Sequence, residues 1–240
     1  MSIKRIGLPV IGLLLVFLCR AQTADEVINR YITFTGGAGA WKKIKTMTSS
    51  GTYNYGGMIF PFQSFSKAPD RYKYVVSYKG KSFIQSYDGV EGWKIDGFKN
   101  ETKKTILKGN DAKAMANEAD VDLESPLINY QQKGHSVILD GKDTVNGRPC
   151  YKILLLRKEG DTAVCFFDSG SYALVKKQAV SRNNELNNSI LDIYYGDYRT
   201  TDGIKQPHSI ICKSNGQDIL SITIKNIKFN VPLANSLFKP

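Results

Sequence analysis

The chain has 240 residues and a basic excess, with 33 lysines and arginines against 22 aspartates and glutamates. The basic residues are scattered singly or in pairs, and the sequence has no arginine-rich or aromatic-basic cluster, which argues against nucleic-acid binding. Such a scatter is typical of a solvated surface, and it also suits contact with an anionic membrane surface.

The first 21 residues have the three regions of a secretory signal. Two basic residues precede an uncharged apolar stretch at 6–18, and the small residues Cys19 and Ala21 suit cleavage after Ala21. The stretch is shorter than the roughly 20 apolar residues of a transmembrane helix. Residues 16–19 faintly resemble a lipoprotein box, but a leucine stands where that motif has a small residue, so lipid anchoring at Cys19 is the less favoured alternative. We expect a periplasmic protein.

The remaining residues, 22–240, are predicted to form one domain. No proline- or serine-rich linker, repeat or low-complexity segment interrupts them. Barrels and sandwiches made of β-strands often reach about 200–250 residues as a single unit. We expect this domain to be a monomer.

A capping box of Thr23 and Glu26 predicts an amphipathic helix, whose apolar positions recur at helical spacing until Gly36-Gly37. After residue 45 the period changes to two, which predicts strands. A second helical region is expected at 110–118, with a looser segment to 130. The predicted strands are 46–55, 58–67, 71–78, 81–87, 93–96, 135–139, 149–157, 162–168, 172–182, 189–198, 207–214 and 217–228.

The alternation also indicates which side chains face the interior. A mainly β sheet of this size with one apolar face must curl or be covered, and two helical segments are few for covering it. We therefore expect a strongly curved sheet with helices plugging its mouth. Periodicity predicts an apolar pocket lined by Ile28, Tyr31, Met58, Phe60, Phe62, Tyr72, Tyr74, Val76, Leu220, Ile222 and Ile224. The excess of aromatic residues on strands suits either such a cavity or a large β core.

No motif for catalysis, metal or cofactor binding is found. His135 and His208 stand far apart without neighbouring ligands and are predicted to be strand-end polar residues. There is no G-x-S-x-G motif. The glycines at 36–39 follow a helix instead of a strand, so they predict a helix C-cap and turn rather than a phosphate loop. Asp-Gly pairs predict hairpin turns at 88–89, 140–141 and 202–203, and Asp168 begins a turn at 168–171. We predict a protein that is not an enzyme.

Three cysteines follow the signal, an odd number that leaves at least one thiol free. Strands at 151–157 and 162–168 form a hairpin that turns at Glu159-Gly160. In that register Cys165 faces Leu154, and Cys150 lies roughly 13 Å further along, at about 3.3 Å per residue. A disulfide between Cys150 and Cys165 would need another register.

Five segments carry a resemblance to a known family: 27–37, 44–51, 87–93, 195–208 and 227–238. Their signatures include Tyr87-Asp88-Gly89-x-x-Gly92-Trp93 and Tyr195-x-Asp197-Tyr198 followed by Asp202-Gly203-Ile204 and Pro207-His208. With these, nearly the whole mature chain resembles the outer-membrane lipoprotein-sorting proteins, which are related in fold to the lipoprotein carrier LolA and its receptor LolB. We expect Asp88, Gly89, Gly92 and Trp93 to set turns and packing.

The resemblance implies an unclosed antiparallel half-barrel, lidded by an N-terminal helix and one or two short helices, whose concave apolar face accepts acyl chains. It implies a carrier or receptor of lipid or lipid-modified proteins that needs no cofactor. A sensor or interaction module like the LolA-like domain of RseB is the alternative. The carrier's lid-locking arginine and the receptor's protruding apolar loop match no position of this sequence.

Overall fold

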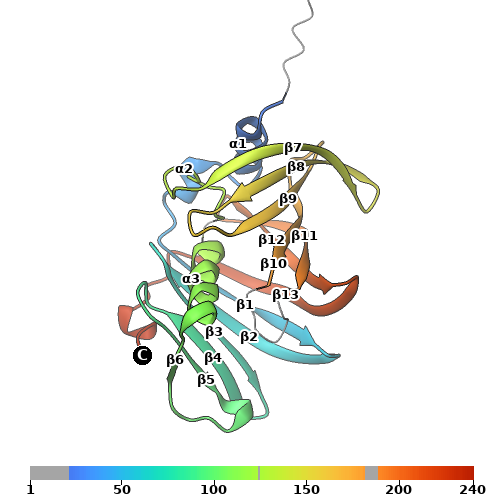
Figure 1. Ribbon diagram of the computed structural model, residues 1–240. Coiled ribbons are helices and arrows are strands. Elements are labelled where there is room, and N and C mark those ends of the chain that lie inside the picture. The colour runs from blue at the N-terminus through green and yellow to red at the C-terminus, as the bar shows by residue number, and fades with distance from the viewer. Residues whose placement is uncertain (1–21, 124, 182–188) are drawn as a thin grey trace, which may run out of the picture.

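The computed structural model describes residues 22–123, 125–181 and 189–240 (Figure 1). The predicted signal peptide at 1–21 lies outside this part of the chain. Within this part of the chain the strands are accompanied by the helices α1 (Ala24–Phe34), α2 (Ala38–Trp41) and α3 (Gly109–Leu123) and by the 3₁₀ turns η1 (Gly97–Lys99) and η3 (Asn235–Leu237). The strands are β1 (Thr46–Tyr55), β2 (Met58–Lys67), β3 (Arg71–Tyr78), β4 (Lys81–Tyr87), β5 (Gly92–Asp96), β6 (Thr105–Ile106), β7 (Ser136–Val145), β8 (Arg148–Leu156), β9 (Thr162–Asp168), β10 (Leu174–Val180), β11 (Ile190–Thr201), β12 (Ile204–Ser214) and β13 (Gln217–Phe229).

All described strands belong to one antiparallel sheet that is not closed, with β6 and β7 at its two edges. Each half is a run of consecutive strands, β1–β6 and β7–β13, and the halves join where the first strand pairs with the last. The chain passes from one edge to the other through α3. The predicted mainly β fold, an unclosed antiparallel sheet with few helices, is confirmed.

Helices α1 and α3 cover the same face of the sheet, which we call the inner face. Under α1, the buried side chains of Val27, Ile28 and Tyr31 pack against apolar residues of β8 and β9. Under α3, Met115 and Ala119 pack against β3. Figure 1 shows α3 lying over the β2–β5 half and α1 beside β7. Each helix therefore lids one half of the sheet.

The helix α1 begins and ends at the predicted residues. The Thr23 hydroxyl accepts a hydrogen bond from the Glu26 amide at 3.1 Å, which satisfies one of the free donors of the first turn. At the other end, the Gly37 amide donates to the Ile32 carbonyl at 2.8 Å, and Gly36 and Gly37 have φ of 118° and 87°. Glycine adopts such backbone angles without a steric penalty, so it stops the helix here.

One predicted turn is wrong. Asp140-Gly141 lies within β7, at a β-bulge where the pairing with β8 shifts. The extra residue of a bulge is accommodated by Gly141 at φ 84°, so the strand continues instead of reversing. The chain reverses at Asn146-Gly147, whose φ of 50° and 77° suit a tight hairpin. The predicted turns at Asp88-Gly89 and Asp202-Gly203 are confirmed.

The predicted register of the β8–β9 hairpin is wrong by one residue, since Cys165 pairs with Ile153 instead of Leu154. The Arg157 amide donates to the Asp161 carbonyl at 2.8 Å, so this pair encloses a three-residue loop, 158–160, instead of the expected two-residue turn. A one-residue slip moves side chains to the opposite face. The correct register places Cys165 under α1. All three described cysteines are free and buried.

The C-terminal segment lies on the opposite, outer face of β3–β5. Phe238 is fully buried there, and its carbonyl accepts hydrogen bonds from Trp93 Nε1 at 2.7 Å and Ser86 Oγ at 3.1 Å. Lys73 Nζ donates to the Leu237 carbonyl at 3.2 Å. The indole of Trp93 therefore has a structural role, as predicted, and the inner face is left to the helices.

Candidate functional site

An apolar row of side chains crosses the inner face at the centre of the sheet. The strand pairing aligns Phe60 on β2 with Tyr53 on β1, Ile222 on β13, Ile210 on β12 and Tyr195 on β11. Every member of this central row is half-buried. The row lies between the two helices, because α1 packs on β8 and β9 and α3 on β2–β5. It is therefore an apolar surface that neither lid fully covers.

A second row runs beside the first and contains one charged residue. Successive pairings join Leu220, Cys212, Ile193, Lys177, Cys165 and Ile153, from β13 to β8. Exposure varies along this second row: Leu220, Ile193 and Lys177 are half-buried and Cys212 is buried, whereas Cys165 and Ile153 are buried beneath α1. The uncovered part of the inner face therefore ends near Lys177.

The register brings all nine predicted strand residues of the pocket to the inner face, and the two predicted residues of α1 face the same side. Four of the eleven are buried in packed core: Ile28, Tyr31, Tyr72 and Val76. Six are half-buried: Phe60, Phe62, Tyr74, Leu220, Ile222 and Ile224. Met58 is 53% exposed at the β1–β2 turn. The half-buried set overlaps the central row, whereas Ile28 and Tyr31 pack against β8 and β9.

Sequence reasoning missed four residues of this surface: Tyr53, Ile193, Tyr195 and Ile210. Their signal was present, because Leu191, Ile193 and Tyr195 alternate along β11 with side chains that face the other way. The alternation was less obvious because the intervening residues include Tyr194, an aromatic that packs against the core on the outer face. Apolar side chains on both faces hide which face is which.

Several titratable side chains of the inner face have raised pKa values. Burial raises the pKa of Tyr53 to about 12 and that of Cys165 to about 11. Burial also raises the pKa of Tyr195, and the neighbouring tyrosine raises that of Lys177. At neutral pH the phenols and thiols are therefore uncharged and Lys177 is charged. A thiol with a raised pKa is a poor nucleophile, so these cysteines are suited to packing.

The histidines are packed side chains as well. His208 lies within β12 rather than at a strand end, which corrects the prediction, and its Nδ1 is 2.8 Å from the Ile224 carbonyl. His135 precedes β7, and its Nδ1 accepts from the Lys158 amide at 3.2 Å. Among residues 22–123, 125–181 and 189–240, no group of three potential metal ligands is found. In the same residues no helix is both long and apolar enough to cross a membrane.

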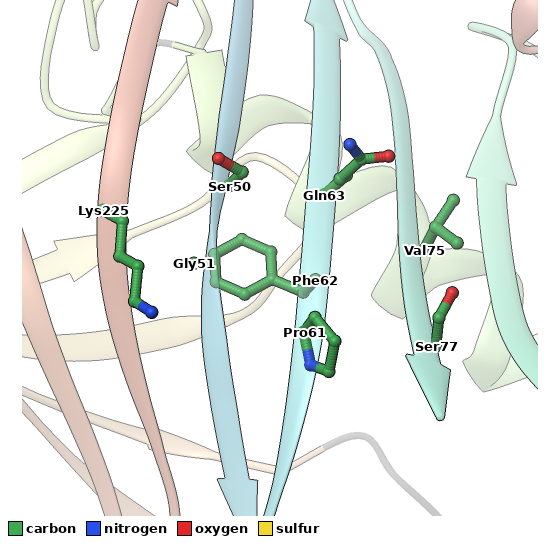
Figure 2. Close-up of a pocket in the computed structure, with 8 residues that line it drawn as sticks. All are labelled: Ser50, Gly51, Pro61, Phe62, Gln63, Val75, Ser77 and Lys225. Carbon is green, nitrogen blue, oxygen red and sulfur yellow. The ribbon is translucent and has the colours of Figure 1, made fainter. Parts of the chain in front are cut away.

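Two hollows of the described surface lie away from the central row. One, of about 320 Å³, is on the outer face and is drawn in Figure 2, where the ring of Phe62 lies beside Gly51. The register puts Ser50, Gln63 and Val75, which line it, on the opposite side from the apolar rows. The other, of about 890 Å³, is an open groove along residues 230–234. Both hollows are shallow and open to solvent, so they enclose too little of an acyl chain to be good sites for one.

An open antiparallel sheet with helices on its inner face is the LolA-like fold, and three solved structures show this similarity. A LolA superfamily protein from Nitrosomonas europaea is 11% identical, with a TM-score of 0.57 over 92% of this chain and 99% of that one. A putative outer membrane lipoprotein-sorting protein domain from Vibrio parahaemolyticus is 11% identical, with a TM-score of 0.60 over 89% and 94%. A DUF1329 family protein from Desulfovibrio piger is 14% identical, with a TM-score of 0.59 over 90% and 96%.

At these sequence identities the comparisons show a common fold but not a common function. No family model matches the chain, and no curated protein matches it in sequence.

Proposed function

We propose that this protein is an exported, non-enzymatic carrier or receptor that holds acyl chains of lipids or lipid-modified proteins against its inner face. The central row carries the proposal: five half-buried side chains form an apolar strip between two helical lids. Water contact with such a strip is unfavourable, and covering it with hydrocarbon supplies about 0.8 kcal/mol per CH₂ group. Binding of this kind needs no covalent chemistry.

The fold supports the same proposal. One structural neighbour is described as a putative outer membrane lipoprotein-sorting domain and another as a LolA superfamily protein. A protein of this kind in the periplasm would meet its ligand after export, which agrees with the predicted signal peptide. A lipid sensor with a protein partner, the alternative, would use the same strip.

An exposed apolar patch lies at the β1–β2 turn, at one end of the β1–β6 half, and suits contact with a membrane surface. This tip patch consists of Tyr55, Met58, Ile59, Tyr78 and Phe98, all exposed. It adjoins the central row, because the Phe60 ring lies 5.3 Å from the Tyr78 ring and 6.0 Å from the Phe98 ring. Exposed lysines flank it at 79, 81 and 99. Aromatic side chains beside lysines are typical of surfaces that bind anionic lipid.

The test is a titration of the delipidated mature protein with a fluorescent fatty acid. Ile222 and Thr223 are neighbours on β13 that point to opposite faces. We expect Ile222→Asp to weaken binding at least tenfold, because it places a charge in the strip, while Thr223→Asp leaves the affinity unchanged. Thermal unfolding of both variants controls for loss of structure. Absence of binding by the wild type would refute the proposal.

A further inference from the structure

Two consecutive lysines of β10 point to opposite faces of the sheet. Lys176 lies on the outer face, where its Nζ is 3.0 Å from Asp192 Oδ1 and its charge lies over the Phe166 and Tyr194 rings. Lys177 lies on the inner face, where the pairing places it between Cys165 and Ile193. The outer lysine is part of a partly buried ion pair, whereas the inner one stands in an apolar row.

The amine of Lys177 is directed towards the end of the central row. It donates a hydrogen bond to the hydroxyl of Tyr195, the last member of that row. The carboxylate of Glu118, from α3, also raises the pKa of Lys177, and the amine lowers that of the Cys212 thiol. The pKa of Lys177 is raised, with Tyr195 as the largest cause and the Glu118 carboxylate as a further one, and the carboxylate favours the charged form of the amine at neutral pH.

A charged amine on an apolar surface is costly unless it has an anionic or hydrogen-bonding partner. An amphiphile with an acidic end group supplies such a partner at the same time as its hydrocarbon covers the strip. The five strands of the central row span about 19 Å at about 4.8 Å between strands, which is comparable with an extended long-chain fatty acid. The geometry of the face and the position of its charge therefore fit one ligand class.

We propose that Lys177 and Tyr195 anchor the carboxylate of a long-chain fatty acid whose hydrocarbon lies along Ile210, Ile222, Tyr53 and Phe60. This inference rests on the proposed function and narrows its ligand. A charge-assisted hydrogen bond from an ammonium group to a carboxylate is about twice as strong as a neutral one. Acyl chains joined by ester or amide bonds have no charge at their end and gain nothing from this anchor. Glu118 competes with the ligand for the amine and keeps Lys177 charged in the empty protein.

The experiment compares a fluorescent fatty acid with its methyl ester on the delipidated mature protein at pH 7.5. We expect the acid to bind the wild type at least tenfold more tightly than the ester. Lys177→Met should abolish this preference by weakening the acid alone, and Tyr195→Phe should reduce it. Lys176→Met, the matched control on the outer face, should keep it. Lys177→Gln serves as a second variant if the methionine substitution prevents folding.

The outcomes separate this inference from the proposed function. Equal binding of acid and ester by the wild type, or an intact preference in Lys177→Met, would refute the anchor and leave acyl-chain binding in place. Binding of neither probe would refute both.

Discussion

Glycine at position 51 is required by a close approach between strands. A Cβ atom there would lie 2.0 Å from the Thr223 carbonyl oxygen and 2.9 Å from the Phe62 ring. The Phe62 ring lies beside this glycine (Figure 2) and covers its backbone, which has no side chain of its own. The bulge between Ser50 and Gly51 in the pairing with β13 brings the two backbones together. Bulges next to glycine bend a strand, and here the bend falls where the two halves of the sheet join.

We predict that Gly51→Ala lowers the free energy of unfolding by at least about 1–3 kcal/mol, the usual cost of overpacking a core. The backbone oxygen cannot move without breaking the pairing of β1 with β13. Gly196 on β11 is the matched control, since the nearest atom to its added Cβ is 4.0 Å away. Urea unfolding of both variants measures the difference. Equal midpoints would contradict the assigned role of Gly51.

Buried protons on the inner face predict a loss of stability at high pH. Cys165 is 1% exposed, and burial raises its pKa from 9.0 to about 11, while that of Tyr53 rises from 10.0 to about 12. The folded protein therefore holds these protons more tightly than the unfolded chain. The stabilisation is fully present below about pH 9 and is lost as the pH rises towards 11.

We expect the thiol of Cys165 alone to lower the free energy of unfolding by roughly 1 kcal/mol at pH 10 relative to pH 7. Urea titrations at pH 7, 9 and 10 measure this change. Cys165→Ala should show a smaller fall over the same range. A wild type whose stability stays constant to pH 10 would show that the thiol is not held in its neutral form.

Among the elements, those with local signals were predictable from the sequence. The bounds of β1, β2, β3 and β4 agree with the predicted ones, since alternation and turn residues act within a few positions of each other. The bulge at Asp140-Gly141 was not predictable, because an aspartate-glycine pair suits a bulge and a turn equally well. Asn146-Gly147 carried the stronger hairpin signal and was overlooked.

Features that depend on distant residues were hidden from the sequence. The short strand β6 is defined by two residue pairs with β5. The C-terminal segment is positioned by hydrogen bonds from Trp93, Ser86 and Lys73. The placement of Ile28 and Tyr31 likewise follows from which half of the sheet α1 covers. Periodicity predicts which face of the sheet a side chain lies on, but how deeply that side chain is buried depends on tertiary packing.

At the scale of the whole molecule, the lids divide the sheet unequally. Packing under α1 produces fully buried side chains such as Ile153 and Phe167, whereas the side chains of the central row are only half-buried. The central row continues to the tip patch, so under the proposed function an acyl chain would pass between a membrane and the inner face without leaving apolar surface. The same proposal implies lipid exchange at the tip rather than entry beneath α1.

This path predicts that the tip patch mediates membrane binding. Ile59 is 59% exposed at the β1–β2 turn, so Ile59→Asp should leave folding intact and reduce binding to phosphatidylglycerol-containing vesicles several-fold. Ile138 on the edge strand β7 is 49% exposed, and Ile138→Asp is the matched control. Lysines 79, 81 and 99 each contribute up to about 1 kcal/mol near an anionic surface, so salt should weaken binding of the wild type. Vesicle sedimentation at low and high salt measures both effects. Equal losses in the two variants would show that the added charge, rather than the tip patch, governs membrane binding.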